Sequence, residues 1–427
     1  MNFHFLKLST ILPLIIAFTS CNSKDEEVLT FWGLGSEGEY VQKLIPEFEH
    51  RNPGIKINAQ MIPWTAAQEK LITAYASDNL PDAFQLGNTW IPQFVALNAL
   101  ENLDQRVQKS TEIKPDNYFS GIWETNVIED IIYGIPWYID TRVLFYRVDV
   151  LAEAGYDSAP TSWQELYDLS VKIKTRYADK EKYAIYLPTN EWVIFVIFGL
   201  QNGATLLRDN NCYGNFSSNE FKTAFEYLIR FHKEGLAPKG ISQVTNVYQA
   251  FAQGFFSLYI SGPWNITEFK KWMTGDLTDT WMTAPLPSPD GSGPGISLAG
   301  GSSLVISRKS RKKDTIWKFI EYLSQPATQL EFFRLLNDLP AVKSAWDDPI
   351  LKDDPYIKAF YTQFENVQSM PKITEWEQIA FSKLQQFAEV AAGGVMTVDE
   401  SLREMDKVTD QILEKRRWLI NKKNNIE

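Results

Sequence analysis

Residues 131–155 read IIYGIPWYIDTRVLFYRVDVLAEAG, and the interpretation of the rest of the chain starts from this stretch. It contains a short apolar run, a Gly-Ile-Pro break and a second apolar run that ends at Tyr146, followed by a helix-like start. Asp140 and Arg142 stand between the runs. Because unpaired charge is costly to bury, these two residues are expected to line a cleft, while the runs on either side belong to a sheet. An ordinary strand with a surface salt pair gives the same local pattern.

The first 21 residues have the features of an export signal and are not expected to belong to the fold. A positively charged start with Lys7 precedes the apolar run 8–18, which is too short to span a bilayer. Ser20-Cys21 then resembles a bacterial lipobox, in which Cys21 is diacylated and becomes the mature amino terminus, although Phe18 replaces the usual Leu or Val. Simple secretion with cleavage nearby is the alternative. Residues 22–27 are polar and acidic, as in a flexible tether.

Composition narrows the class of protein. About 400 mature residues suggest two domains. The net charge of −11 and the pI near 5.1 argue against nucleic acid or an anionic membrane surface as a partner. The three histidines, His4, His50 and His232, are scattered, so grouped-histidine catalysis or metal binding is not expected. Only Cys212 follows Cys21, which leaves no internal disulfide if Cys21 carries lipid. The 14 Trp and 18 Tyr suit stacking on sugar rings.

A glycine-rich loop follows the first predicted strand, 28–32. Residues 33–38 read GLGSEG, which is formally the GxGxxG of dinucleotide-binding proteins. The next predicted strand, 55–61, runs into Met-Ile-Pro with no acidic residue to hold a ribose, so nucleotide binding is not supported. The exposed N–H groups of such a loop can instead serve a neutral polyol.

The alternation of strands and helices predicts an α/β protein with a mostly parallel sheet. Helical spacing over 41–48 and 66–77 alternates with strands at 55–61 and 80–86. The last strand has a polar exit at 87–90, which is where open α/β sheets bind ligands. Further helices are predicted to start at 161–162, to lie buried over 192–200 and to cover 221–229, capped by Ser217 or Ser218.

Several motifs occur in an order that is more specific than any one of them. They are Gly-Ile-Pro with Asp-Thr-Arg at 134–142, Thr-Ser-Trp-Gln-Glu-Leu at 161–166, Gly-Pro-Trp at 262–264 and Gly-Gly-Val-Met-Thr-Val at 393–398. In this order the chain resembles the bacterial extracellular solute-binding proteins of family 1, the maltose-binding-protein-like sugar-binding lipoproteins of ABC importers. The resemblance covers nearly the whole mature chain.

This resemblance implies a two-lobed periplasmic-binding-protein-like fold of type II, with the ligand cleft between lobes joined by hinge crossings. The signal would comprise 1–20 and the lipidated tether 21–27. The N-terminal lobe would comprise 28–138 and 286–338, and the C-terminal lobe 139–285 and 339–427. The stretch 284–301 would be taken for a flexible linker by composition alone, but by resemblance it is the return crossing.

The resemblance and the positions of polar residues at strand ends also suggest the site. Trp32, Trp90, Trp192, Trp264 and Trp376 are expected to stack on sugar faces. Hydrogen bonds are expected from Glu37, Asn88, Asp140, Arg142 and Glu191, with Tyr138, Gly301 and Ser302 beside them. No metal and no organic cofactor is implied.

The expected function is the capture of a mono- or oligosaccharide by hinge closure and its delivery to an ABC permease. The protein would be exported, monomeric and held to a bacterial membrane, on its periplasmic or extracellular face, only by the lipid anchor. One alternative is a surface glycan-binding lipoprotein without a permease. Another is a glycoside hydrolase using the two carboxylates of Asp140 and Glu191. The whole-chain pattern favours transport over an enzyme.

Overall fold

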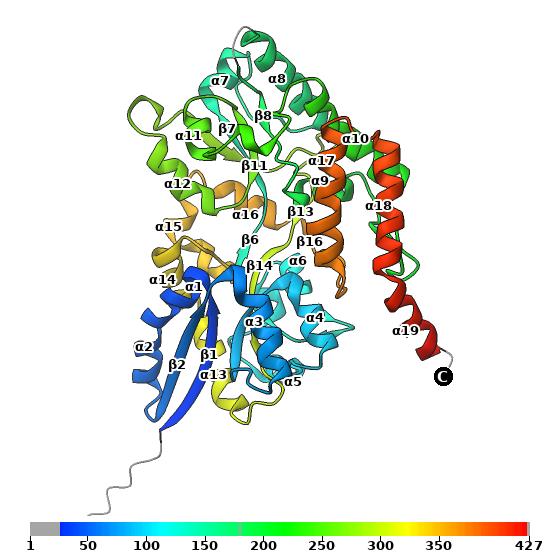
Figure 1. Ribbon diagram of the computed structural model, residues 1–427. Coiled ribbons are helices and arrows are strands. Elements are labelled where there is room, and N and C mark those ends of the chain that lie inside the picture. Colours follow the sequence, from blue (N-terminus) through cyan, green and yellow to red (C-terminus); the bar gives the residue numbers. More distant parts are fainter. Residues whose placement is uncertain (1–25, 179–180, 425–427) are drawn as a thin grey trace, which may run out of the picture.

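The computed structural model describes residues 26–178 and 181–424, arranged as two lobes that each surround a β-sheet (Figure 1). We call the lobe with the six-stranded sheet the N-lobe and the lobe with the four-stranded sheet the C-lobe. The leader and the lipidation site proposed at Cys21 lie outside the described residues.

The N-lobe sheet has the order β15-β6-β14-β3-β1-β2. Strand β1 pairs in parallel with β2 and β3, whereas β14 runs antiparallel to β3 and β6. The alternation predicted from the sequence is confirmed, although β3 starts three residues later than expected. The prediction of a mostly parallel sheet is wrong, since three of the five pairings in this sheet are antiparallel, all of them made by strands that border the passages to the other lobe. The strands are β1 (Glu27–Leu34), β2 (Ile55–Ile62), β3 (Ala83–Gly87), β6 (Ile135–Asp140), β14 (Gly300–Ile306) and β15 (Leu339–Pro340).

Short helices connect and cover these strands. Pro46 lies in the first turn of α2, where its missing N–H costs nothing. The helices on this side are α1 (Gly35–Tyr40), α2 (Ile45–Arg51), α3 (Trp64–Ala76), α4 (Ile91–Ala96), α5 (Asp104–Lys109), α6 (Ser120–Glu124), α13 (Lys313–Leu323), α14 (Pro326–Leu336) and α15 (Pro349–Lys352), with one-turn helices η1 (Val41–Lys43), η2 (Asn88–Trp90), η3 (Pro115–Asn117) and η6 (Lys343–Asp347).

The C-lobe sheet has the order β12-β7-β11-β8 and is surrounded by longer helices. Helix α9 is buried almost along its whole length, as predicted from its uninterrupted apolar sequence. The strands are β7 (Val143–Arg147), β8 (Ile185–Tyr186), β11 (Leu258–Ser261) and β12 (Trp281–Ala284), and the helices are α7 (Val148–Glu153), α8 (Trp163–Arg176), α9 (Trp192–Gln201), α10 (Asn219–Lys233), α11 (Val247–Ala252), α12 (Trp264–Trp272), α16 (Lys358–Phe364), α17 (Gln385–Ala392), α18 (Val398–Ile412) and α19 (Glu414–Asn424).

Small elements complete the structure. A π-helix, η7, runs directly into α17, and α17 to α19 lie along one side of the molecule (Figure 1). The remaining elements are β4 (Val127–Ile128), β5 (Ile131–Ile132), β9 (Leu207–Arg208), β10 (Tyr213–Gly214), β13 (Ser297–Leu298), β16 (Val367–Gln368), η4 (Ile241–Gln243), η5 (Gly275–Leu277) and η7 (Gln378–Leu384).

Helix caps follow the sequence signals. The Ser162 hydroxyl accepts a hydrogen bond from the Glu165 N–H and caps α8, while the Glu165 carboxylate accepts from Thr161. Ser218, rather than Ser217, caps α10. Thr397 and Glu400 form a complete capping box at the start of α18.

The chain passes between the lobes at β6 to β7, again between β12 and β14, and a third time between α15 of the N-lobe and α16 of the C-lobe. The second passage is not a free linker, because the Leu286 N–H donates to Gln363 and the Gln363 amide donates to the carbonyl of Gly295. Strand β15 pairs with Tyr138 and Ile139 of β6 in the N-lobe sheet. The residue boundaries given above for the two lobes stay a prediction. Residues 139–140 and 339–340 are assigned there to the C-terminal lobe, whereas in the structure they lie in β6 and β15 of the N-lobe sheet.

One large hydrophobic cluster extends from the N-lobe sheet, where it includes Phe31 and Ile139, to one face of the C-lobe sheet, where it includes Phe145 and Trp281. A second large cluster packs on the other face of the C-lobe sheet and includes Leu144, Ile260 and most of α9. Within 26–178 and 181–424, no helix combines the length and apolar character that a membrane span requires.

Candidate functional site: the cleft between the lobes

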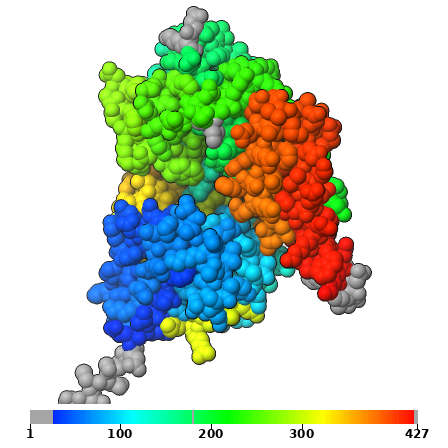
Figure 2. Space-filling model, viewed as in Figure 1, coloured from blue at the N-terminus to red at the C-terminus, as the bar shows by residue number. Residues whose placement is uncertain are grey.

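A cleft of about 430 Å³ lies between the lobes, at the carboxyl ends of β1, β2 and β3. Figure 2 shows the surface hollowed where the blue N-lobe, the green C-lobe and the orange α17 region meet. Both lobes and the first two passages between them contribute side chains. The lining residues are Glu37, Trp64, Gly87, Asn88, Thr89, Trp90, Tyr138, Ile139, Asp140, Arg142, Glu191, Trp192, Val193, Pro263, Trp264, Leu298, Gly300, Gly301, Asp338 and Glu377.

The glycine-rich segment 33–38 forms the end of β1 and the start of α1, with no loop between them, and it carries Glu37 into the cleft. A Cβ on Gly33 would overlap the backbone of Gly38, so glycine at both positions lets α1 pack directly against β1. The Glu37 carboxyl accepts a hydrogen bond from Trp64 Nε1 at 3.2 Å and another from the Tyr138 hydroxyl. Burial nevertheless raises the pKa of Glu37. The GxGxxG pattern therefore serves helix packing and the positioning of a carboxyl group.

Arg142 organises the C-lobe side of the cleft. Its guanidinium group donates to Asp140 Oδ1 at 2.9 Å and lies 3.6 Å from Glu191 Oε1. It also lies 4.7 Å from the centre of the Trp264 ring, in the geometry of a cation–π contact. Burial raises the pKa of Asp140, against the opposing effect of the Arg142 charge. Asp140 at the end of β6, Glu191 just before α9 and Trp264 at the start of α12 thus meet at one cation, which lies between β6 and β7.

The backbone around Arg142 is held by the returning chain. The Ser297 hydroxyl donates to the Arg142 carbonyl at 2.9 Å and accepts from the Arg142 N–H and the Thr141 hydroxyl. A Cβ on Gly300 would overlap Asp140, its partner in the sheet. The first two passages between the lobes are therefore packed against each other where the cleft begins.

Tryptophans form walls on both sides of the cleft. On the N-lobe, Trp64 and Trp90 pack edge to face with their ring centres 5.6 Å apart. On the C-lobe, Trp264 is 47% exposed, whereas Trp192 is 8% exposed. A Cβ on Gly262 would overlap the Trp264 ring, so this glycine lets the ring fold back over the strand end. Flat apolar faces therefore stand beside the carboxyl groups.

Polar side chains of the N-lobe rim connect to the rest of the cleft. Asn88 Nδ2 donates to the Ala299 carbonyl at 2.9 Å, and the Thr89 hydroxyl donates to the Glu377 carboxyl. Burial raises the pKa of Glu377. The Thr89–Glu377 hydrogen bond joins η2 of the N-lobe to the segment preceding η7.

Most of the site residues predicted from the sequence come together in this cleft. They are Glu37, Asn88, Trp90, Tyr138, Asp140, Arg142, Glu191, Trp192, Trp264 and Gly301. Their binding roles stay predictions.

Three predicted site residues lie elsewhere. Trp32 packs beside α3, with Lys70 Nζ 5.0 Å from its ring centre, and lies short of the strand end because β1 continues to Leu34 and runs directly into α1. Ser302 is buried in β14, where its hydroxyl donates to the Leu86 carbonyl at 3.0 Å. Trp376 is 1% exposed and packs edge to face against Trp192 in the C-lobe core. The neighbouring Glu377 enters the cleft in place of Trp376.

Sequence reasoning missed four polar or aromatic residues of the cleft: Trp64, Thr89, Asp338 and Glu377. Trp64 and Thr89 follow the ends of β2 and β3, so the strand-end rule that selected Trp90 also applies to them. Asp338 directly precedes the predicted crossing at Leu339. Glu377 follows no predicted strand end or crossing, and only its position next to Trp376 in the sequence pointed to it.

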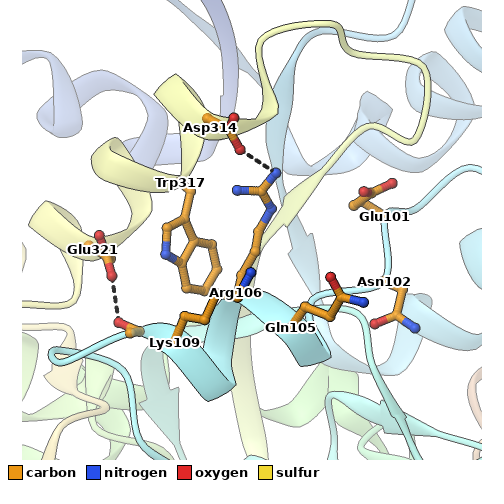
Figure 3. Close-up of a pocket in the computed structure, with 9 residues that line it drawn as sticks. Glu101, Asn102, Gln105, Arg106, Lys109, Asp314, Trp317 and Glu321 are labelled. Atoms are coloured by element: carbon orange, nitrogen blue, oxygen red, sulfur yellow. Dashed lines mark hydrogen bonds and ion pairs between the residues drawn. The ribbon is translucent and has the colours of Figure 1, made fainter.

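A larger hollow of about 650 Å³ lies on the N-lobe alone, between α5 and α13 (Figure 3). Its carboxyl groups are all engaged: Asp314 pairs with Arg106 at 2.8 Å, Glu101 pairs with Lys313 at 2.7 Å, and Glu321 accepts a hydrogen bond from the Ser110 hydroxyl. Trp317 at its base is 7% exposed and belongs to the N-lobe core. This hollow therefore lacks the free aromatic faces and unpaired carboxyl groups of the cleft.

The arrangement in the cleft suits binding rather than catalysis. Asp140 and Glu191 contact the same guanidinium group, so the pair considered for glycoside hydrolysis does not stand on opposite sides of an open space. Among the described residues, no group of three or more Cys, His, Asp or Glu side chains has the arrangement of a metal site.

The fold and the cleft define a two-lobed binding protein whose ligand enters between the lobes. The chain belongs to the family described as bacterial extracellular solute-binding proteins, whose profile matches residues 32–330. This membership confirms the predicted family and fold, and the prediction that the protein binds a solute and is not an enzyme.

Individual relatives agree over most of the chain. The solved structure of the sugar-binding protein MalE from the phytopathogen Xanthomonas citri is 43% identical, with a TM-score of 0.89 over 92% of this chain and 99% of that one. The maltodextrin-binding protein MdxE of Bacillus subtilis is 24% identical over 92% of each chain. The diacetylchitobiose-binding protein DasA of Streptomyces coelicolor is 27% identical over 69% of this chain and 68% of its own.

Proposed function

We propose that this protein captures a mono- or oligosaccharide between its lobes by hinge closure and delivers it to the membrane subunits of an ABC importer. The observation that carries this proposal is the combination of Trp64 and Trp90 on one lobe with Trp192 and Trp264 on the other, around a shared set of carboxyl groups. The relatives named above are sugar-binding proteins by their own names.

The chemistry of the lining matches a sugar. The apolar faces of a pyranose ring stack on flat aromatic side chains, and its hydroxyl groups bind carboxylates, amides and guanidinium groups. The exposed ring of Trp264 lies beside Asp140, Arg142 and Glu191, so one sugar residue placed there would meet both kinds of group at once.

Closure follows from the way the lobes are connected. The passage at Asp140–Val143 and the stretch 285–299 lie next to each other, so rotation about them would bring the two tryptophan walls together. The closed, loaded form would then dock, as a monomer, on a permease.

A thermal-shift screen tests the proposal. The panel would include glucose, maltose, trehalose, cellobiose and N,N′-diacetylchitobiose, each in large excess. A ligand at one hundred times its dissociation constant stabilises the folded state by about 2.7 kcal/mol, which gives an easily measured rise in Tm. A flat response to the neutral saccharides, together with a clear shift from amino acids or peptides, would contradict the saccharide assignment.

We further propose that the protein is exported and anchored through a lipid on Cys21, a residue outside the described part of the chain. Support comes from the apolar run followed by Ser20-Cys21 and from the family, whose members are extracellular. In a bacterial host, the wild type should incorporate labelled palmitate and sediment with membranes, whereas Cys21→Ala should incorporate none. Wild-type protein that carries no label and stays in the soluble fraction would contradict the anchor and leave the sugar-binding proposal intact.

A further inference from the structure

The charges that line the cleft are strongly unbalanced. Five of its described lining residues carry a carboxyl group, and Arg142 is the one that carries a positive charge. Arg142 contacts Asp140 and Glu191, and Glu377 accepts a hydrogen bond from Thr89. Glu37 is hydrogen-bonded by Trp64 and Tyr138. Asp338 is left without any of these partners.

Asp338 stands between α14 and β15. The preceding residue, Asn337, ends α14 in the left-handed conformation, with φ of 63°, and the chain then enters the sheet at Leu339. This sharp turn directs the Asp338 side chain into the cleft. The residue is partly exposed as a whole, yet its Oδ2 atom is buried and has no hydrogen-bond partner among the described residues.

The surroundings of Asp338 disfavour its charge. Desolvation raises the pKa of Asp338 well above its ordinary value, and the nearby carboxyl groups of Glu37 and Asp140 raise it further. A buried carboxyl group without a partner costs free energy in the unliganded protein. A ligand that supplies the missing hydrogen-bond partner would remove this cost.

We propose that Asp338 is a specificity-determining residue of the cleft, which binds a hydroxyl group of a neutral saccharide and, together with Glu37 and Asp140, excludes acidic and phosphorylated sugars. This inference rests on the proposed saccharide function. A hydroxyl group suits the position because it donates to a carboxylate and can also accept from a protonated carboxyl group. An anionic sugar would add a further negative charge beside three carboxyl groups, at a depth where solvent screening is weak.

The first test measures stability without any ligand. A carboxyl group whose pKa is raised by folding makes the folded state take up protons more readily than the unfolded chain, so it lowers stability as the pH rises through the folded-state pKa. Asp338→Asn removes this effect. Its Tm at pH 8 should therefore exceed that of the wild type by about 2 °C, and the difference should shrink towards pH 4.5. Asp353 is exposed, so Asp353→Asn serves as the matched control, and its Tm should equal that of the wild type at both pH 8 and pH 4.5.

The second test measures binding by calorimetric titration at pH 7. Probes are maltose, trehalose and cellobiose, with glucuronate and trehalose 6-phosphate as the anionic probes. Wild type and Asp353→Asn should bind at least one neutral probe and neither anionic probe. Asp338→Asn should bind that neutral probe about tenfold more weakly, because the hydrogen bond between the carboxyl group and the sugar hydroxyl is lost.

The outcomes separate the two proposals. If the wild type binds none of the neutral sugars, the saccharide function fails and this inference fails with it. If the wild type binds a neutral sugar and Asp338→Asn binds it equally well, only the inference is overturned. A variant that loses both apo stability and binding would make Asp338 a structural residue, which also overturns it. Higher apo stability combined with weaker binding is the result that supports it.

Discussion

Arg142 holds a central place among the individual residues of the cleft, because its guanidinium group joins two carboxylates and one aromatic ring. With 10% of its side chain exposed, it donates a hydrogen bond to Asp140, lies 3.6 Å from Glu191 Oε1 and stands over the ring of Trp264. One cation thereby positions a hydrogen-bonding group and a stacking surface together.

Trp264→Ala should separate a binding role from a packing role. Loss of a stacked aromatic face of roughly 50 to 100 Å² removes about 1–3 kcal/mol, so affinity for the saccharide found in the thermal-shift screen should fall ten- to hundredfold. Apo stability should change little, because this side chain is 47% exposed.

Trp376→Ala is the matched control, since that tryptophan is 1% exposed in the C-lobe core. It should lose about 3–5 kcal/mol of unfolding free energy. Calorimetric titration and urea unfolding of both variants would distinguish a binding role of Trp264 from a packing role. Unchanged affinity and a large loss of stability in Trp264→Ala would place that residue among the packing residues.

His232, near the end of α10, gives a pH dependence of stability. Its Nδ1 lies 2.9 Å from the Pro238 carbonyl, and burial lowers the pKa of the imidazole. The unfolded chain takes up a proton below its ordinary pKa of about 6.5 and the folded chain does not, so this group makes stability fall on acidification, by at most about 1.4 kcal/mol per pH unit.

His232→Asn keeps a side-chain N–H for the Pro238 carbonyl but does not titrate. Urea unfolding at pH 7.5 and pH 5.5 should therefore show a smaller difference for this variant than for the wild type. Equal differences in both proteins would show that the histidine is not held neutral by the fold.

At the scale of elements, the start of β14 depends on glycine. Gly301 has φ of 118°, and a Cβ there would overlap the Tyr138 carbonyl oxygen across the sheet. The close approach of β14 to β6 brings Asp140, Tyr138 and the Gly300-Gly301 backbone together at the mouth of the cleft.

Gly301→Ala should therefore lower the free energy of unfolding by more than an ordinary substitution at a glycine with positive φ does. Strain and backbone displacement together should remove about 3 kcal/mol or more. Gly155→Ala is the control, because Gly155 has φ of 82° with open space around it, and about 1 kcal/mol is expected. Urea unfolding gives both values, and similar losses in the two variants would argue that β14 can move away from β6.

At the scale of the whole molecule, the proposed closure is a rotation of one lobe against the other. Aromatic walls stand on separate lobes, while the first two passages that connect the lobes lie side by side at one edge of the cleft. The Thr89–Glu377 hydrogen bond and the ion pair of Lys372 with Glu124 at 3.3 Å join opposite sides and would have to adjust during closure.

Small-angle X-ray scattering should detect this closure. The radius of gyration should fall when a binding saccharide saturates the wild type, and a non-binding sugar at the same concentration should leave it unchanged. A saturated protein with the same radius of gyration as the apo form would mean that the ligand binds without rotation of the lobes.

The sequence by itself determined the family, the alternation of strands and helices, and the chemistry around Asp140 and Arg142. These features are encoded locally: hydrophobic periodicity, Gly-Pro breaks and two charged residues two positions apart in an apolar context. Most residues of the cleft could be predicted from the sequence, because polar residues just beyond the ends of adjacent parallel strands meet at one edge of a sheet.

Only the tertiary structure decided which side of an element each side chain faces. Trp376 and Glu377 are neighbours in the chain, yet one packs in the C-lobe core and the other enters the cleft. Trp32 lies outside the cleft because β1 extends two residues further than predicted. The partnerless carboxyl of Asp338 likewise depends on Glu37 and Asp140, which reach it from distant parts of the chain. Such contacts depend on packing between segments far apart in sequence, which no local pattern records.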